Sequence, residues 1–77
     1  MVEDWRSRIA VDPNILAGKP IIKGTRISAE LIVDLLAKGW TTETLLENYP
    51  QLKKEDVTAV LKYVTEILKE EKVYLLP

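Results

Sequence analysis

The sequence contains neither cysteine nor histidine. Without cysteine there is no disulfide and no thiolate zinc site, which agrees with a cytosolic protein. Without histidine the chain lacks the commonest metal ligand and the commonest general base. Its acidic residues are scattered, and no serine or threonine has a visible histidine or lysine partner. We therefore expect no enzyme, no cofactor, no metal ion and no small-molecule substrate.

Long apolar runs are missing as well. No stretch approaches the roughly 18 residues that a membrane-spanning helix needs. The first eight residues include Glu3, Asp4, Arg6 and Arg8 instead of a basic start followed by an apolar run, so no signal peptide is predicted. We expect a cytoplasmic protein without a membrane partner.

A chain of 77 residues makes one small domain. Such a domain has a marginal core, and this one has no disulfide or metal to support it, so a homodimer is expected. The net charge of −1 argues against tight non-specific binding of nucleic acid. The charges are uneven, however: positive charge is in excess in residues 1–27 and negative charge in residues 28–77. A surface that binds anions is therefore expected in the N-terminal third.

Residues 18–27 are the most distinctive part of the chain. They combine two glycines, a proline and three cations around the pair Ile21-Ile22, which predicts a short strand that enters a tight cationic loop. Such a loop is able to hold a phosphate group. The residues expected to contact the anion are Lys19, Lys23, Thr25 and Arg26. In the alternative interpretation, glycine and proline shape a hairpin, and Arg26 pairs with an acid such as Asp12 or Glu30.

The N-terminal segment, residues 1–27, is expected to be extended. Short strands at Arg8–Val11 and Ile21–Ile22 would form a loose antiparallel hairpin, which is marginal unless it packs on helices or pairs with another chain. The tail of residues 73–77 is apolar without helical spacing, and aromatic residues near the termini suit an interface. The side chains expected at an interface with another chain are Trp5, Ile21, Ile22, Tyr74, Leu75 and Leu76.

The first helix is predicted to begin at Ser28, a good N-cap residue. Gly39 is expected to end this helix with a left-handed C-cap. A short second helix is predicted over residues 42–49, with Thr41 as its N-cap and Pro50 as its stop. A third helix is predicted from about residue 54 to residue 72, where apolar residues such as Leu61 and Leu68 recur at helical spacing.

Residues 28–72 thus have the outline of a helix-turn-helix unit whose third helix reads DNA. The side chains that this helix would present to DNA are Lys54, Thr58 and Lys62. Glu55 and Asp56 stand at its start and would face phosphates, which disfavours DNA binding; a merely solvated face is the alternative. Overall we predict a mainly α protein: a trihelical, homeodomain-like helix-turn-helix unit with a short N-terminal β-hairpin.

The run from Arg8 to Ser28, with its G-K-P-x-I-x-G-T-R-I core, resembles the small prokaryotic family called domain of unknown function 433. The resemblance continues through residues 35–40, 49–52 and 55–57, and it covers roughly residues 8–68. One departure is Lys53, where the family often has serine or threonine, so the cap of the third helix stays open. No catalytic residue is implied.

The resemblance implies a homeodomain-like trihelical fold with an N-terminal β element. Many members resemble antitoxins that are encoded beside a toxin of the PIN-like nuclease class. It therefore implies a protein that binds a PIN-like toxin and represses its own operon as a dimer on operator DNA. The alternative is a module for protein–protein interaction or dimerisation that does not bind nucleic acid.

Overall fold

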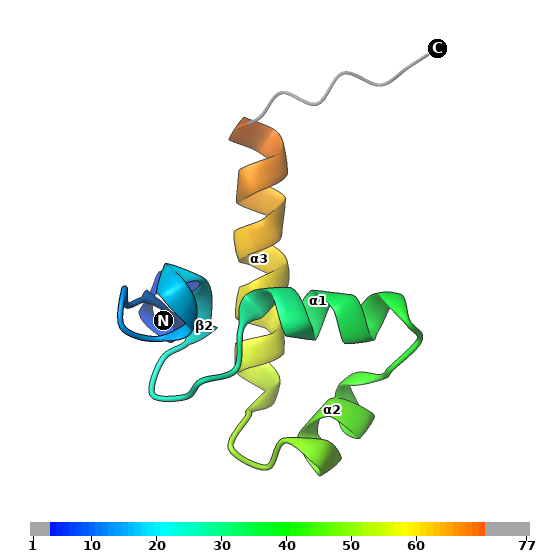
Figure 1. Ribbon diagram of the computed structural model, residues 1–77. Coiled ribbons are helices and arrows are strands. Elements are labelled where there is room, and N and C mark those ends of the chain that lie inside the picture. The colour runs from blue at the N-terminus through cyan, green and yellow to red at the C-terminus, as the bar shows by residue number, and fades with distance from the viewer. Residues whose placement is uncertain (1–3, 71–77) are drawn as a thin grey trace.

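The computed structural model describes residues 4–70. In chain order they form η1 (Trp5–Arg8), β1 (Ile9–Val11), η2 (Leu16–Gly18), β2 (Pro20–Ile22), α1 (Ala29–Ala37), α2 (Thr42–Asn48) and α3 (Lys54–Glu70), where η marks a short 3-10 turn. Figure 1 shows α1 crossing α3, with α2 near the N-terminal end of α3 and the strands on the other side. The predicted trihelical fold with an N-terminal hairpin is confirmed.

The first two helices begin where hydroxyl side chains cap them. The Ser28 Oγ accepts a hydrogen bond from the backbone N–H of Leu31 at 3.0 Å. The Thr41 Oγ1 accepts one from the backbone N–H of Thr44 at 3.1 Å. Each hydroxyl satisfies an N–H group that has no partner within its helix. Both predicted N-caps are therefore confirmed.

The C-terminal end of α1 is a left-handed cap at Gly39, whose φ is +99°. The backbone N–H of Gly39 donates to the Leu36 carbonyl at 3.0 Å, and that of Trp40 donates to the Leu35 carbonyl at 3.1 Å. These two bonds form a Schellman motif, and Leu35 and Trp40 both pack against the core. This ending turns the chain sharply toward α2.

The two strands pair antiparallel, with Ile9 opposite Ile22 and Val11 opposite Pro20. Trp5–Arg8, directly before β1, form a 3-10 turn, so the prediction of an extended chain is wrong for these residues. The Asp4 Oδ1 accepts a hydrogen bond from the backbone N–H of Arg6 at 2.9 Å, which closes η1 instead. A second 3-10 turn, η2, interrupts the connection between the strands.

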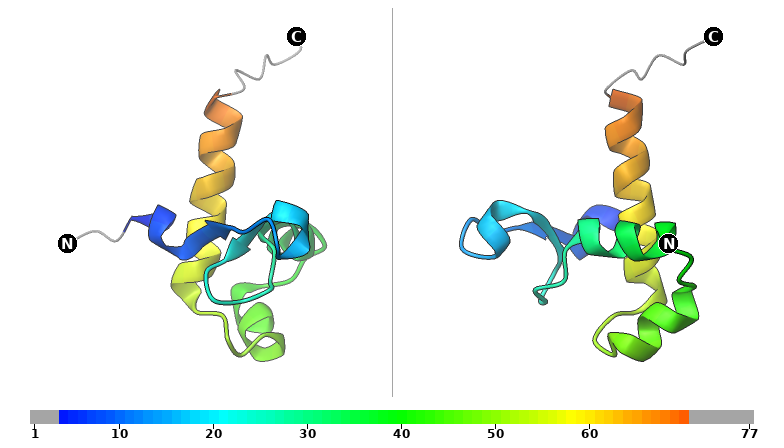
Figure 2. Two further views of the ribbon diagram at one scale, coloured as in Figure 1. Left: turned by 60° about the vertical axis from the view of Figure 1, so that its left-hand side comes forward. Right: turned by 45° about the vertical axis from the view of Figure 1, so that its right-hand side comes forward.

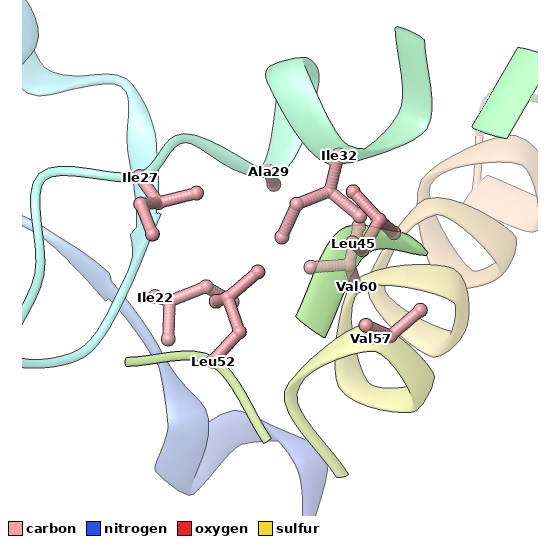
Figure 3. Packing of buried hydrophobic residues seen from close by; sticks show 8 residues of the cluster. All are labelled: Ile22, Ile27, Ala29, Ile32, Leu45, Leu52, Val57 and Val60. Atoms are coloured by element: carbon pink, nitrogen blue, oxygen red, sulfur yellow. The ribbon is translucent and has the colours of Figure 1, made fainter. Parts of the chain in front are cut away.

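The core gathers side chains from β2, the three helices and the loops between them (Figure 3). Its eight buried residues are Ile22, Ile27, Ala29, Ile32, Leu45, Leu52, Val57 and Val60. Ile22 has 3% of its surface exposed, and the neighbouring Ile21 has 2%. The expectation that these two isoleucines contact another chain is therefore wrong, because both are already buried within this chain.

The second half of α3 runs beyond the other elements (Figure 1). Leu61 and Leu68 keep the predicted helical spacing, yet they are 48% and 52% exposed. The predicted end of this helix at residue 72 and the tail of residues 73–77 lie outside the described residues. None of the helices within residues 4–70 has the length and apolar character to cross a membrane.

Candidate nucleic-acid interface

One buried carboxylate, that of Asp56, holds the start of α3. Its Oδ2 accepts a hydrogen bond from the backbone N–H of Lys53 at 2.8 Å, which caps the helix from its third residue. Its Oδ1 accepts one from the guanidinium of Arg8 at 2.9 Å. The expectation that Asp56 faces phosphates is therefore wrong, because its charge points inward and is paired. Glu55 remains on the exposed side of the helix.

A hollow of about 370 Å³ lies between η1 and the first half of α3. Its lining residues are Trp5, Arg8, Lys54, Glu55, Thr58, Ala59 and Lys62. The lysines and the threonine follow one another at intervals of four residues, so they share one face of the helix. The structure thus brings together the three α3 residues that the sequence predicts for DNA contact. Two ammonium groups and a hydroxyl in one concavity suit a phosphate oxygen.

Trp5 forms one wall of this hollow, because η1 packs on α3 (Figure 2). The ring centroids of Trp5 and Tyr63 lie 5.6 Å apart, with an angle of 51° between the rings. The Arg6 guanidinium carbon lies 4.5 Å from the centroid of the Trp5 ring, within the range of a cation–π contact. Trp5, which the sequence predicts at an interface with another chain, is therefore half-buried against its own chain.

The residues of the predicted cationic loop separate in space. Lys23 lines a second hollow together with Ser7, Arg8 and Asp56. Arg8 lines both hollows and so connects the one at Lys23 with the one at Lys54 and Lys62. We call this combined area the basic surface; it consists of Arg8, Lys23, Lys54, Thr58 and Lys62.

Lys19 and Arg26 lie apart from the basic surface. The Lys19 Nζ is 2.8 Å from the Glu30 Oε1, an exposed ion pair that links the loop to α1. The sequence allowed Arg26 to be the partner of Glu30, but Lys19 takes that place. Arg26 is exposed and forms no ion pair within residues 4–70. It lines two hollows that include no residue of α3.

Thr25 serves the shape of the loop. Its hydroxyl donates to the Ile22 carbonyl at 2.8 Å and accepts from the backbone N–H of Ile27 at 3.0 Å. Gly24 before it has a φ of +81°, which a glycine adopts without strain. This part of the loop therefore follows the alternative interpretation, in which the residues shape the hairpin.

Two residues at or beside the interface were not singled out by the sequence. Arg8 links the two hollows, but its partner Asp56 lies 48 residues away, so no local pattern reveals the pair. Arg6 covers the ring of Trp5, and only the folded η1 places it there. The expected interface residues Tyr74, Leu75 and Leu76 lie outside the described residues.

The fold has a close counterpart among solved structures. A crystal structure of a DUF433 member protein from Anabaena variabilis superposes with a TM-score of 0.76 and 29% sequence identity. The match covers 84% of this chain and 64% of that one. The shared architecture therefore extends over most of the chain described here.

Sequence comparison leads to the same family. An uncharacterized protein, y4eO, from Sinorhizobium fredii is 33% identical over 52 residues. These residues are 68% of this chain and 24% of that protein, so the chain spans about a quarter of that relative. The model of the family described as "Protein of unknown function (DUF433)" matches residues 9–64. The chain therefore belongs to the DUF433 family.

Proposed function

We propose that this protein is an antitoxin-like regulator that binds operator DNA through the basic surface and acts as a dimer. The observation that carries the proposal is the hollow between η1 and α3, in which Lys54, Thr58 and Lys62 converge. Its position on the third helix of a trihelical unit is the position from which helix-turn-helix proteins contact DNA.

The first half of α3 offers two kinds of contact. Lys54 and Thr58 lie in the first two turns, the part of a recognition helix that approaches base edges in the major groove. Lys62 and Lys23 flank them and suit contacts with phosphate oxygens. Since Asp56 is buried and paired with Arg8, only Glu55 opposes an incoming phosphate within the first hollow.

The second part of the proposal concerns the protein partner, a toxin of the PIN-like nuclease class. Its support is the resemblance to antitoxin-like members of the family. The exposed Leu61 and Leu68 add a physical reason for a protein partner, since large apolar side chains gathered on one exposed helix face commonly mark an interface. The alternative is an interaction module that makes protein contacts only.

The DNA half of the proposal is tested by titrating the full chain into a labelled duplex from its own promoter. Binding should weaken linearly in a plot of log affinity against log salt between about 50 mM and about 200 mM. Lys54→Ala and Lys62→Ala should each weaken binding several-fold and reduce the magnitude of the slope by about 1. Fluorescence anisotropy gives both quantities.

Arg26→Ala is the matched control, because it removes an exposed cation that lies apart from the basic surface. It should leave both affinity and slope unchanged. Absence of binding even at low salt would eliminate the DNA half and leave the interaction module. A loss confined to Arg26→Ala would show that the loop, and not α3, contacts DNA.

A further inference from the structure

We propose that Glu55 sets part of the DNA sequence preference, because its carboxylate accepts a hydrogen bond from the exocyclic amino group of cytosine or adenine in the major groove. The inference rests on the proposed function and deepens it by naming a residue that reads a base. Glu55 is the one acidic side chain among the described residues that line the hollow between η1 and α3. A carboxylate within a surface that attracts phosphates requires a role of its own.

The fold itself does not use the carboxylate of Glu55. Glu55 is exposed, and within residues 4–70 its side chain forms no ion pair and no hydrogen bond. The next residue, Asp56, already accepts from the Lys53 N–H and so caps α3. Glu55 adds only the favourable charge that any acid in the first turn of a helix provides. Its carboxylate oxygens are therefore available to a ligand.

Glu55 lies where a recognition helix meets the bases. It stands in the first turn of α3, directly after Lys54 and three residues before Thr58, and all three line the hollow. The N-terminal residues of a recognition helix contact base edges in the major groove. Arg8 and Lys62 line the same hollow, so its cations outnumber its one described acid and a duplex is still attracted.

The chemistry of a carboxylate selects among the bases. An ionised carboxylate accepts hydrogen bonds and donates none. In the major groove, cytosine N4 and adenine N6 carry donors, whereas guanine and thymine present acceptor oxygens there. An amino group opposite Glu55 therefore pairs with it, while guanine or thymine leaves the carboxylate unpaired against another acceptor. Glu55 thus penalises the wrong sequences, and a repulsive group of this kind contributes to specificity.

Selection of binding sites from a randomised duplex pool by the full chain tests the inference. In the sites that the unmodified protein selects, one position should favour cytosine or adenine about tenfold or more over guanine and thymine, and the selection shows which of the two bases is preferred. Sites selected by Glu55→Ala should lose the preference at this position only. Glu55→Gln keeps an acceptor oxygen without the charge and should retain part of the preference.

The same substitutions should tighten binding to a fixed duplex that lacks the selected site, because they remove a charge that repels phosphates. The gain should be several-fold at about 50 mM salt and smaller at about 200 mM, since salt screens the repulsion. Fluorescence anisotropy measures it.

Glu70→Ala is the matched control. Glu70 is an exposed acid of the same helix that forms no ion pair with another described residue. It lies about 22 Å from Glu55 along the helix axis, at 1.5 Å per residue. This distance exceeds the roughly 10 Å over which charges act in salt, so neither the preference nor the affinity should change. Both acids are exposed, and circular dichroism should show that all variants keep their fold.

An unchanged preference in the sites selected by Glu55→Ala overturns the inference, even if affinity rises, because Glu55 then only repels DNA. A preference for guanine or thymine that depends on Glu55 overturns it as well. In both cases the protein binds DNA and the proposed function stands. Absence of binding to any duplex, even at low salt, refutes the proposed function and the inference with it, so the two failures are distinguishable.

Discussion

Asp56 connects two parts of the chain with a single carboxylate. Burying a carboxylate is costly unless hydrogen bonds and an opposite charge compensate for the lost water. Asp56 obtains both, from the backbone N–H of Lys53 and from the guanidinium of Arg8. No buried side-chain nitrogen or oxygen within residues 4–70 lacks a partner. The residue therefore fixes where α3 starts and where η1 approaches it.

Asp56→Ala should lower the free energy of unfolding by about 2 kcal/mol, since it removes a helix cap and leaves a half-buried guanidinium without this partner. Asp56→Asn should cost less, because the amide oxygen still accepts from the Lys53 N–H. Urea denaturation of both variants gives these values. Glu55→Ala, at the exposed neighbouring position, should stay within about 0.5 kcal/mol; equal losses at both positions would contradict the role of Asp56.

At the scale of elements, the ends of the helices decide the path of the chain. α1 stops at a left-handed residue, and the two hydrogen bonds of its Schellman motif direct the chain toward α2. The angle between these two helices sets where α2 meets α3, and it therefore helps to position the basic surface. A change at this single turn is expected to affect the whole trihelical unit.

Gly39→Ala should destabilise the protein by about 1 kcal/mol, because a side chain with a Cβ disfavours a φ of +99°. The space around the position is open, with no atom within 4 Å of an added Cβ, so the cost comes from the backbone conformation. Thermal unfolding followed by circular dichroism measures it. Lys38→Ala, one residue earlier, should leave the midpoint nearly unchanged, and an equal shift in both variants would argue against the left-handed cap.

For the whole molecule, α3 is the element on which the proposed function depends. Its first half packs against the core and η1 and carries Lys54, Thr58 and Lys62 of the basic surface. Its second half runs beyond the other elements (Figure 1).

Co-expression with the product of the neighbouring gene tests the toxin half of the proposed function. A PIN-like toxin should co-purify with this chain and elute as one complex on a sizing column. Lys54→Ala, which alters the basic surface, should leave that complex intact, because the toxin is expected to bind elsewhere on the chain. Elution of the two proteins in separate peaks would count against the antitoxin role without affecting the DNA test.

The features that were predictable from sequence are those with local causes. Ser28 and Thr41 cap the next turn of their own helices, and Gly39 ends the helix it follows, so a few adjacent residues suffice to predict them. The features that were not predictable depend on distant parts of the chain. The inward turn of Asp56 requires Arg8, which is remote in sequence.

The dependence on distant parts of the chain also explains why some apolar residues were assigned wrongly. Ile21 and Ile22 look like an exposed hairpin strand, but the folded chain buries both of them. Leu61 and Leu68 keep the periodicity of a buried helix face, but periodicity does not tell how far the neighbouring elements extend. Leu68 lies where α3 runs beyond the other elements (Figure 1). Leu61 directly follows the fully buried Val60, so its exposure comes from the side of the helix on which it lies.

The Arg8–Asp56 pair has a consequence for the stage of folding at which the molecule becomes able to bind DNA. Its two side chains are separated by most of the chain, so closing the pair requires the hairpin, α1 and α2 to be in place between them. The hollow over Lys54, Thr58 and Lys62 is therefore complete only after the N-terminal segment has docked. A partly synthesised or clipped chain without that segment would lack one wall of the hollow. The ability to bind DNA would therefore appear only with complete folding.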